Sequence, residues 1–492
     1  MALRFQPFSP IFNFRSTKRR RTVLARNEVS ATSNGYPSST LTSKQGKPEA
    51  DIIVIGSGIG GLCSGGLLAR YGQDVLVLES HDVAGGAAHS FDIKGYKFDS
   101  GPSLFSGFQS RGPQANPLAQ VLDALGESIP CANYESWMVY VPEGEFLSRI
   151  GPTEFFKDLE KYAGPDSARE WRKLLDAILP ISAAAMALPP LSIRGDLGII
   201  STAAARYAPS LLKTFAQMGP QGALGATKLL RPFSEIIDSL GIKDPFIRNW
   251  LDLLAFLLAG VKTNGILSAE MVYMFSEWYK PGCTLEYPLQ GSGAIVDALV
   301  RGLQKFGGRI SLKSHVENIV VENGRAVGVK LRGGQFVRAK KAVVSNASMW
   351  DTLSLLPPEV VPKSYRDNIK STPQCESFMH LHLGFDAEVL WRAVEKALGP
   401  GFNREKCEVK LVGTPLTHKR FLRRNRGTYG PAILAGKGTF PGHSTPIPQL
   451  LCCGDSTFPG IGVPAVAASG AIVANSLVSV AEHSQLLDAV GI

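Results

Sequence analysis

The segment DIIVIGSGIGGLCSGGLLARYGQDVLVLES, residues 51–80, decides the fold of this chain of 492 residues. DIIVIG is an apolar run typical of a buried parallel strand, SGIGGLCSGGLLARYG is typical of a turn that opens a helix, and DVLVLES is typical of a second strand. This order predicts one βαβ unit. We therefore predict an α/β fold with a doubly wound, Rossmann-like domain that binds a dinucleotide.

The glycines of the turn have separate tasks in such a unit. Gly56 permits the tight turn, Gly58 lets the backbone approach a pyrophosphate, and Gly61 lets the helix pack closely on the strand. The N-terminus of the helix then faces the phosphates. Glu79 ends the second strand 18 residues after Gly61, where an acid that binds a ribose belongs. Together these features favour a dinucleotide site over a chance glycine-rich turn.

The surroundings of this unit favour FAD over NAD. The pair Gly85-Gly86 follows Glu79 closely, and FDSGPSLF, residues 98–105, places Gly101 in a backbone turn. No second G-x-G-x-x-G follows a strand elsewhere in the sequence, so the sequence shows no separate nicotinamide domain.

The C-terminal stretch PQLLCCGDSTFPGIGVPAVAASG, residues 448–470, repeats the order of strand, glycine-rich turn and helix. Gly454 and Asp455 follow its strand, and the carboxylate can accept a hydrogen bond from the ribityl chain of a flavin. A helix N-cap is the alternative role for Asp455. A helix that begins near Gly462 and Val463 would aim its positive end at the flavin, where reduction places negative charge. FAD is therefore the predicted cofactor.

Several stretches between about residues 51 and 480 carry a family resemblance. They are DIIVIGSGIGGL, the spacing from Glu79 to Gly86, GYKFDSGPSLF, YPLQGSGAIVDALVRGLQKFGG, GTPLTHKRFLRRNRGTYG and GDSTFPGIGVPAVAASG. These stretches resemble the carotenoid isomerase and phytoene desaturase group of FAD flavoproteins, and most closely its plant carotenoid isomerase branch, with retinol saturase as a nearby relative. The resemblance implies that FAD is bound by Gly56, Gly58, Gly61, Glu79, Gly86, Val316 and Asp455.

The same resemblance implies an FAD-dependent oxidoreductase or isomerase of carotenoid biosynthesis. Its substrate would be an apolar polyene isoprenoid. The reaction that the resemblance favours most is the cis–trans isomerisation of a carotenoid. The alternatives are a carotenoid or retinoid desaturase or saturase and a non-catalytic isoprenoid-binding protein of the same fold. No nucleophile and base stand out, and a hydrocarbon leaves no charged anchor to look for, so no catalytic side chain is predicted.

Two places depart from the family pattern. Ala87 stands where many relatives have Arg after the Gly-Gly pair, although the isomerase branch tolerates a small residue there. Glu388 directly joins SFMHLHLGFDA to VLWRAVEKALG, between which the family usually inserts several strands. Missing strands would leave an open sheet edge, so an inactive splice variant of a longer protein is a further alternative.

The fold is expected to divide into two domains. Residues 48–105, 285–347 and 445–485 are expected to form a discontinuous FAD-binding domain. Residues 106–284 and 348–444 are expected to form an α+β substrate domain that lacks strands near residue 388.

Residues 1–47 hold nine Lys and Arg, one acid and twelve Ser and Thr, a composition typical of an organelle transit peptide. We expect a plastid transit peptide, and hence a chloroplast protein in the stroma or associated with a membrane. A disordered basic tail is the alternative. This leader carries +8 of the net charge of +10, so the rest is nearly neutral and nucleic acid is not an expected partner.

Other features give weaker indications. The seven cysteines show no C-x-x-C spacing, and His380 and His382 lack a third ligand at a useful spacing, so no metal site is predicted. The run 250–261 is apolar apart from Asp252, which favours a buried core helix over a substrate wall or a membrane contact. The basic cluster 419–426 is expected to be a solvated face, with anionic lipid of a plastid membrane as the alternative partner.

Overall fold

The computed structural model describes residues 48–141, 144–182, 187–214, 216, 227–279, 281–377, 379–385, 407–425 and 430–492. All of them belong to the unit Thr32–Ile492. The expected transit peptide and the junction at Glu388 lie outside the described residues.

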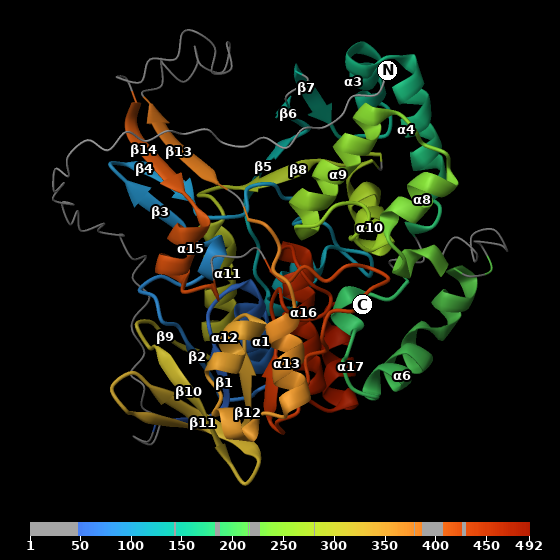
Figure 1. Ribbon diagram of the computed structural model, residues 1–492. Helices are drawn as coiled ribbons and strands as arrows, with labels where there is room; N and C mark the ends of the chain where they lie inside the picture. The colour runs from blue at the N-terminus through green and yellow to red at the C-terminus, as the bar shows by residue number, and fades with distance from the viewer. Residues whose placement is uncertain are drawn as a thin grey trace. The chain divides into compact units, whose positions relative to one another are not determined.

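A seven-stranded sheet forms around the predicted βαβ unit (Figure 1). Its parallel strands are β1 (Glu49–Ile55), β2 (Val75–Leu78), β9 (Arg309–Ser311), β12 (Phe336–Ser345) and β15 (Leu450–Cys452). The antiparallel hairpin of β10 (Val316–Glu322) and β11 (Arg325–Leu331) extends the sheet. The strand order is β10-β11-β12-β1-β2-β9, and β15 pairs with the last residues of β12. Because β1, β2, β12 and β15 are parallel, their carboxyl ends share one edge.

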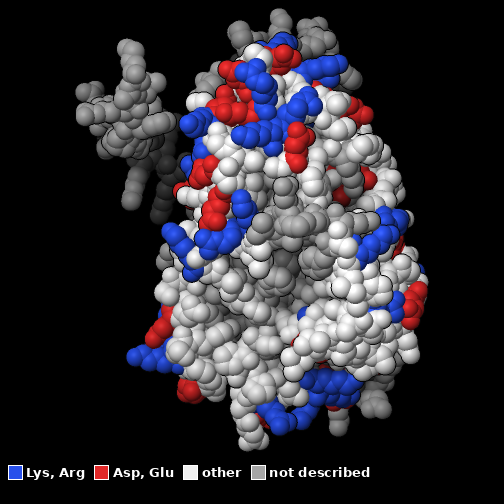
Figure 2. All heavy atoms as spheres, turned by 90° about the vertical axis from the view of Figure 1, so that its right-hand side faces the viewer, with Lys and Arg blue, Asp and Glu red and all other residues white. Residues whose placement is uncertain are grey.

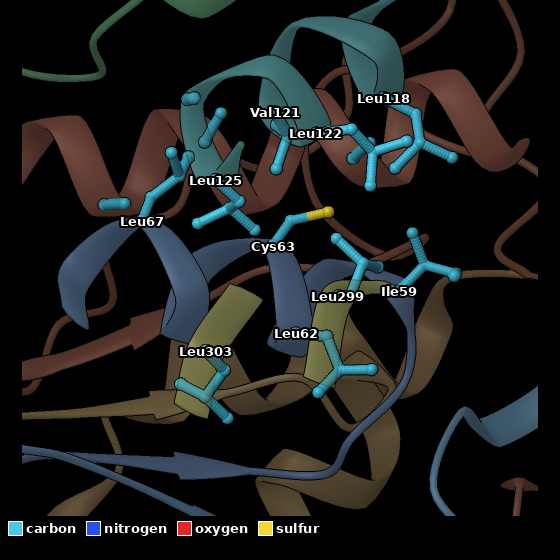
Figure 3. Close-up of a cluster of buried hydrophobic side chains, with 14 of the residues drawn as sticks. Ile59, Leu62, Cys63, Leu67, Leu118, Val121, Leu122, Leu125, Leu299 and Leu303 are labelled. Carbon is cyan, nitrogen blue, oxygen red and sulfur yellow. The ribbon is translucent and has the colours of Figure 1, made fainter. Parts of the chain in front are cut away.

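On one side of this sheet, α1 (Ile59–Arg70) and α11 (Gly293–Lys305) contact the strands, and α2 (Pro117–Leu125) and α16 (Val463–Ser476) pack against α1. Figure 3 shows Leu122 and Leu125 of α2 packed toward Leu67 of α1 and Leu299 of α11. Each such buried side chain contributes about 1.5–3 kcal/mol by leaving water. The backbones of α1 and α16 touch, since a Cβ on Gly470 would lie 2.3 Å from the Gly60 carbonyl oxygen.

The opposite face packs against α12 (Met349–Ser354), the 3-10 turn η5 (Pro358–Val360) and α13 (Lys363–Ser371). Ile53 faces this side of the sheet, whereas Ile52 faces the helices of the other side. Successive side chains of a strand alternate in this way, so a strand buried on both faces reads as an unbroken apolar run.

A second core lies among helices from the middle of the chain. They are α3 (Glu154–Ala163), α4 (Pro165–Ile178), α8 (Phe233–Ser239), α9 (Pro245–Ala259) and α10 (Ser268–Trp278). α9 begins where the Asp244 carboxylate accepts a hydrogen bond from the Ile247 N–H, and it ends at Gly260 in the left-handed region. Trp250 and Leu251 of α9 are buried, which confirms the predicted core helix. No described helix is long and apolar enough to cross a membrane.

The other described strands form separate antiparallel pairs. These are β3 (Ser90–Ile93) with β4 (Tyr96–Asp99), β5 (Cys131–Tyr134) with β8 (Leu285–Pro288), β6 (Ser136–Val141) with β7 (Gly144–Arg149), and β13 (His380–Phe385) with β14 (Cys407–Gly413). The remaining short elements are η1 (Gly86–Ala88), η2 (Pro190–Ser192), α6 (Gly198–Thr202), the π turn η3 (Ala203–Tyr207), η4 (Lys228–Leu230), α15 (Pro415–Leu422) and α17 (Val480–Ala489). The division into an FAD-binding and a substrate domain stays a prediction.

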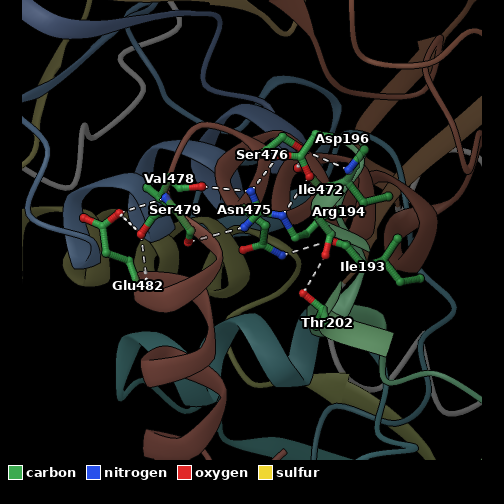
Figure 4. A network of polar contacts seen from close by, with 12 residues as sticks. Ile193, Arg194, Asp196, Thr202, Ile472, Asn475, Ser476, Val478, Ser479 and Glu482 are labelled. Carbon is green, nitrogen blue, oxygen red and sulfur yellow. Dashed lines mark hydrogen bonds and ion pairs between the residues drawn. The ribbon is translucent and has the colours of Figure 1, made fainter. Parts of the chain in front are cut away.

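A polar network ties the segment before α6 to α16 and α17 (Figure 4). Arg194 is buried and donates to both carboxylate oxygens of Asp196 and to the Val478 carbonyl oxygen at 2.8 Å. Asn475 of α16 is fully buried and donates to the Ile193 carbonyl oxygen at 3.0 Å. Because Ile193 lines the cavity described below, the network fastens one cavity wall to α16.

Candidate active site

One cavity of about 1340 Å³ runs from the carboxyl edge of the main sheet to α9 and α10. Eleven of the twelve predicted cofactor residues line it: Gly56, Gly58, Glu79, Gly85, Gly86, Gly101, Val316, Gly454, Asp455, Gly462 and Val463. The twelfth, Gly61, is not part of the lining. The parallel strands bring most of these residues together from distant parts of the sequence, because they lie near the carboxyl end of a strand or the start of a helix. Val316 instead begins β10, and Gly101 follows β4 of a separate pair.

The glycine turn after β1 leaves no room for side chains. Gly56 has a φ of 90°, a conformation that residues with a Cβ rarely adopt. A Cβ on Gly61 would lie 2.2 Å from the Gly56 carbonyl oxygen. Gly58 caps α1 without a side-chain hydrogen bond and lines the cavity, so the first N–H groups of α1 suit an anion there.

The carboxylate of Glu79 is held at the cavity wall by the neighbouring turn. One of its oxygens accepts hydrogen bonds from the Ser57 N–H at 2.9 Å and the Ser57 hydroxyl at 2.6 Å, and the other accepts from the His81 N–H at 2.8 Å. The Gly85 N–H donates to the Ser57 carbonyl oxygen at 3.0 Å. Ser57 thus connects Glu79 to the Gly-Gly pair, a role that the sequence reasoning missed.

The position of Ala87 explains why residue 101 is a glycine. A Cβ on Gly101 would lie 2.3 Å from the Ala87 carbonyl oxygen, and both residues line the cavity. The Ser100 hydroxyl donates to that same oxygen at 2.9 Å. The departure at Ala87 therefore leaves a cavity wall shaped by backbone rather than by a long basic side chain.

Asn346 lies between the two glycine-rich turns and was also missed. It directly follows β12, and its N–H donates to the Ile55 carbonyl oxygen at 2.9 Å. A Cβ on either Gly58 or Gly454 would come 2.8 Å from its side-chain amide. A polar residue at the end of the buried run AVVS was the available signal, since such positions meet at the carboxyl edge of the sheet.

Asp455 forms an ion pair with Arg424, and this pairing was not predicted. Gly462 caps α16, so Asp455 is not the N-cap of that helix. The basic cluster is accordingly only in part a solvated face: Lys419 is exposed, but Arg424 turns into the cavity. Nearby, burial raises the pKa of Asp351, whose carboxylate accepts a hydrogen bond from the Ser348 hydroxyl at 2.6 Å.

Beyond the N-terminus of α16, the cavity extends into a part that we call the far lobe. Gly462 and Val463 begin this helix as predicted, without a side-chain cap. A Cβ on Gly462 would lie 3.4 Å from the Leu258 carbonyl oxygen of α9. Leu254, Leu257 and Leu258 line the lobe beyond this contact. α9 is therefore both the core helix that its sequence favoured and a cavity wall.

His380 and His382 line the cavity together with His418 of α15. The rings of His380 and His382 are 6.1 Å apart, and those of His380 and His418 are 6.0 Å apart. Burial lowers the pKa of all three, that of His418 to about 4, which favours neutral imidazoles at pH 7. Among the described residues, no group of three or more His, Cys, Asp or Glu could hold a metal ion.

The chain belongs to the flavin-containing amine oxidoreductase family, whose model matches residues 59–423. It is 29% identical to the chloroplastic prolycopene isomerase of Daucus carota, over 96% of this chain and 88% of that protein. It is 30% identical to prolycopene isomerase 2 of an Oncidium hybrid cultivar, over 87% of this chain and 83% of that protein. The all-trans-retinol 13,14-reductase of Rattus norvegicus is 27% identical over 63% of this chain and 49% of its own length.

Two solved structures show the same fold. An oxidoreductase from Methanosarcina mazei matches with a TM-score of 0.53 and 19% identity, covering 85% of this chain and 98% of its own. A putrescine oxidase matches with a TM-score of 0.56 and 15% identity, covering 87% of this chain and 98% of its own. The predicted α/β fold with a Rossmann-like domain is thereby confirmed.

The family match also confirms the predicted class, an FAD-dependent oxidoreductase, the cofactor FAD, and the resemblance to carotenoid isomerases. The described residues fit FAD because the glycine turns admit close backbone contact, and two uncapped helix N-termini border the same cavity.

Proposed function

We propose that this flavoenzyme isomerises cis double bonds of a carotenoid to trans. The observation that carries the proposal is the continuity of the cavity from the glycine turns to the lobe of Leu254, Leu257 and Leu258. A long apolar chain in that lobe would meet the cofactor at the N-terminus of α16. The similarity to prolycopene isomerases supports a carotenoid as the substrate.

Bound FAD supplies redox chemistry, and the residues of this chain place it. The N-terminus of α1 at Gly58 would bind the pyrophosphate, Glu79 a ribose, and Asp455 the ribityl chain. The positive end of α16 at Gly462 and Val463 would stabilise negative charge on the reduced ring. The remaining cradle would consist of Gly56, Gly61, Gly85, Gly86, Gly101, Val316 and Gly454.

The lobe would bury the polyene and exclude water from it. Leu254 and Met274 line the cavity and are almost fully buried, so the wall is apolar and closely packed where the substrate would lie. Removing apolar surface from water contributes about 25 cal/mol per Å². A hydrocarbon substrate would therefore bind here without a charged anchor.

The test is the mass of the product. The purified holoprotein, with its flavin reduced or oxidised, would be incubated with prolycopene, and products would be separated and weighed. We expect a trans-enriched carotene of unchanged mass. A product that differs in mass by hydrogens would contradict isomerisation and support the alternative, a desaturase or saturase, which the similarity to a retinol reductase favours.

We further propose that the protein acts in the chloroplast, as the names of its similar proteins suggest, after removal of residues 1–47. A peripheral contact with a plastid membrane would supply the apolar substrate. Leu197 and Ile200 are exposed by 83% and 66%, and Leu230, exposed by 74%, lines the cavity. Figure 2 shows charged side chains at the top, along the sides and at the bottom of one face of the molecule, and few in the pale stretch between them.

A flotation assay tests the membrane contact. We expect the protein to float with vesicles of plastid lipids and the variant Leu197→Asp to float less, because a charge near the lipid interface is costly. Equal flotation of both proteins would contradict the contact at this site.

A further inference from the structure

One face of α10 turns four side chains into the cavity. Glu270, Tyr273, Met274 and Glu277 all line it. Their spacing of three, four and seven residues places them on one side of the helix. α10 thus presents acidic groups to a lobe that α9 lines with leucines.

Glu270 differs from the other carboxyl groups of the cavity. Glu79 accepts hydrogen bonds from Ser57 and His81, and Asp99 accepts from the Ser90 hydroxyl and the Ser292 N–H. Within the described part of the chain, Glu270 has no hydrogen-bond or ion-pair partner for its carboxyl group. An unpartnered carboxyl group in an apolar cavity is costly when charged, and this suggests a use other than structural.

The surroundings favour the neutral acid. Burial raises the pKa of Glu270 to about 8, with no contribution from a neighbouring charge. Titratable groups near it on α10 are Tyr273 and Glu277. On adjacent elements, Arg231 pairs with Glu235 at 2.8 Å and Arg248 pairs with Asp238 at 2.6 Å, both near the surface. This environment favours the protonated form of Glu270 at pH 7.

We propose that Glu270 is the catalytic acid and base of the isomerisation, which makes the inference dependent on the proposed function. Its O–H donates a proton to one carbon of the cis double bond, whose π electrons form the new C–H bond. The positive charge spreads over the remaining conjugated chain. The former double bond is then single and rotates, and the Glu270 carboxylate takes the proton back while the C–H electrons rebuild the double bond in trans. One proton leaves and returns, and the polyene loses no electrons.

The position of Glu270 suits this step. It stands in the first turn of α10, next to Ala269 and three residues after Leu267, both of which also line the cavity. The lobe borders the N-terminus of α16 through the contact of Leu258 with Gly462. The acid would thus act on a chain that lies between α10 and the cofactor end, and the carboxylate formed would face the positive polyene.

The experiment compares the wild-type holoprotein with Glu270→Gln, Glu270→Asp and the control Glu235→Gln on the outside of α8. Glutamine matches the neutral acid in shape, so fold, flavin absorbance and carotenoid binding should persist. We expect kcat for prolycopene to fall about 100-fold or more in Glu270→Gln, as for loss of a general acid, with KM little changed. Glu270→Asp should recover part of the rate, and Glu235→Gln should match the wild type.

The pH profile gives a second readout. Because the protonated form is active, wild-type kcat should be level below pH 8 and fall about tenfold per unit above it, and this fall should vanish in Glu270→Gln. If the wild type isomerises prolycopene and Glu270→Gln does so equally fast, the catalytic role of Glu270 is overturned. The proposed function then still stands. Loss of flavin from Glu270→Gln would also overturn the catalytic role, because the effect of the substitution would then be structural. A wild-type product of altered mass would overturn both proposals.

Discussion

The two ends of the cavity are built differently. The cofactor end consists mainly of backbone, with glycines at Gly56, Gly58 and Gly454 and uncapped helix N-termini. The far lobe consists of side chains on α9 and α10. Backbone approach demands glycine at fixed spacings, whereas an apolar wall accepts many residues of suitable volume. The cofactor end is therefore visible as a motif, and the lobe is not.

The largest effect is expected from closing the cofactor end. In Gly61→Ala the new methyl would meet the Gly56 carbonyl oxygen at 2.2 Å, so the turn must open and FAD should be lost. The measurement is flavin absorbance per purified protein. Gly442→Ala is the control, since a Cβ there meets nothing within 4 Å. A flavin-loaded Gly61→Ala would show that the turn is not the cradle.

A smaller effect is expected in the lobe. Leu257→Asn replaces a half-exposed lining side chain, and the loss of about 1.5 kcal/mol of apolar contact should raise KM about tenfold at unchanged flavin content. Leu289→Asn, on an exposed leucine outside the lining, is the control. Steady-state kinetics with prolycopene check this, and an unchanged KM would place the substrate elsewhere.

The smallest effect concerns the Arg194 network, which fastens one cavity wall to α16. Arg194→Met leaves the Val478 carbonyl oxygen without its partner and should cost about 1–3 kcal/mol in the free energy of unfolding. Thermal unfolding against wild type measures it, with the exposed Arg325→Met as the control. If both variants unfold at the wild-type temperature, the network does not fasten the cavity wall.

Sequence reasoning reached the cofactor end because its signals are local. Eleven predicted residues lie in one cavity, and Gly61 shows the close backbone approach that the motif requires. The partners Asn346 and Arg424 were missed since no fixed spacing connects them to the glycine turns. The expected lack of strands near Glu388 and the expected transit peptide stay predictions.

By itself the sequence determined the βαβ unit, the FAD-type turns and the family, because strand periodicity and glycine spacing follow from backbone sterics. Only the tertiary structure decided that α9 faces both a core and a cavity, that Arg424 pairs with Asp455, and that Glu270 stands unpartnered in the lobe. These features depend on which distant side chains share one space, and the packing of parallel strands and helices sets that arrangement.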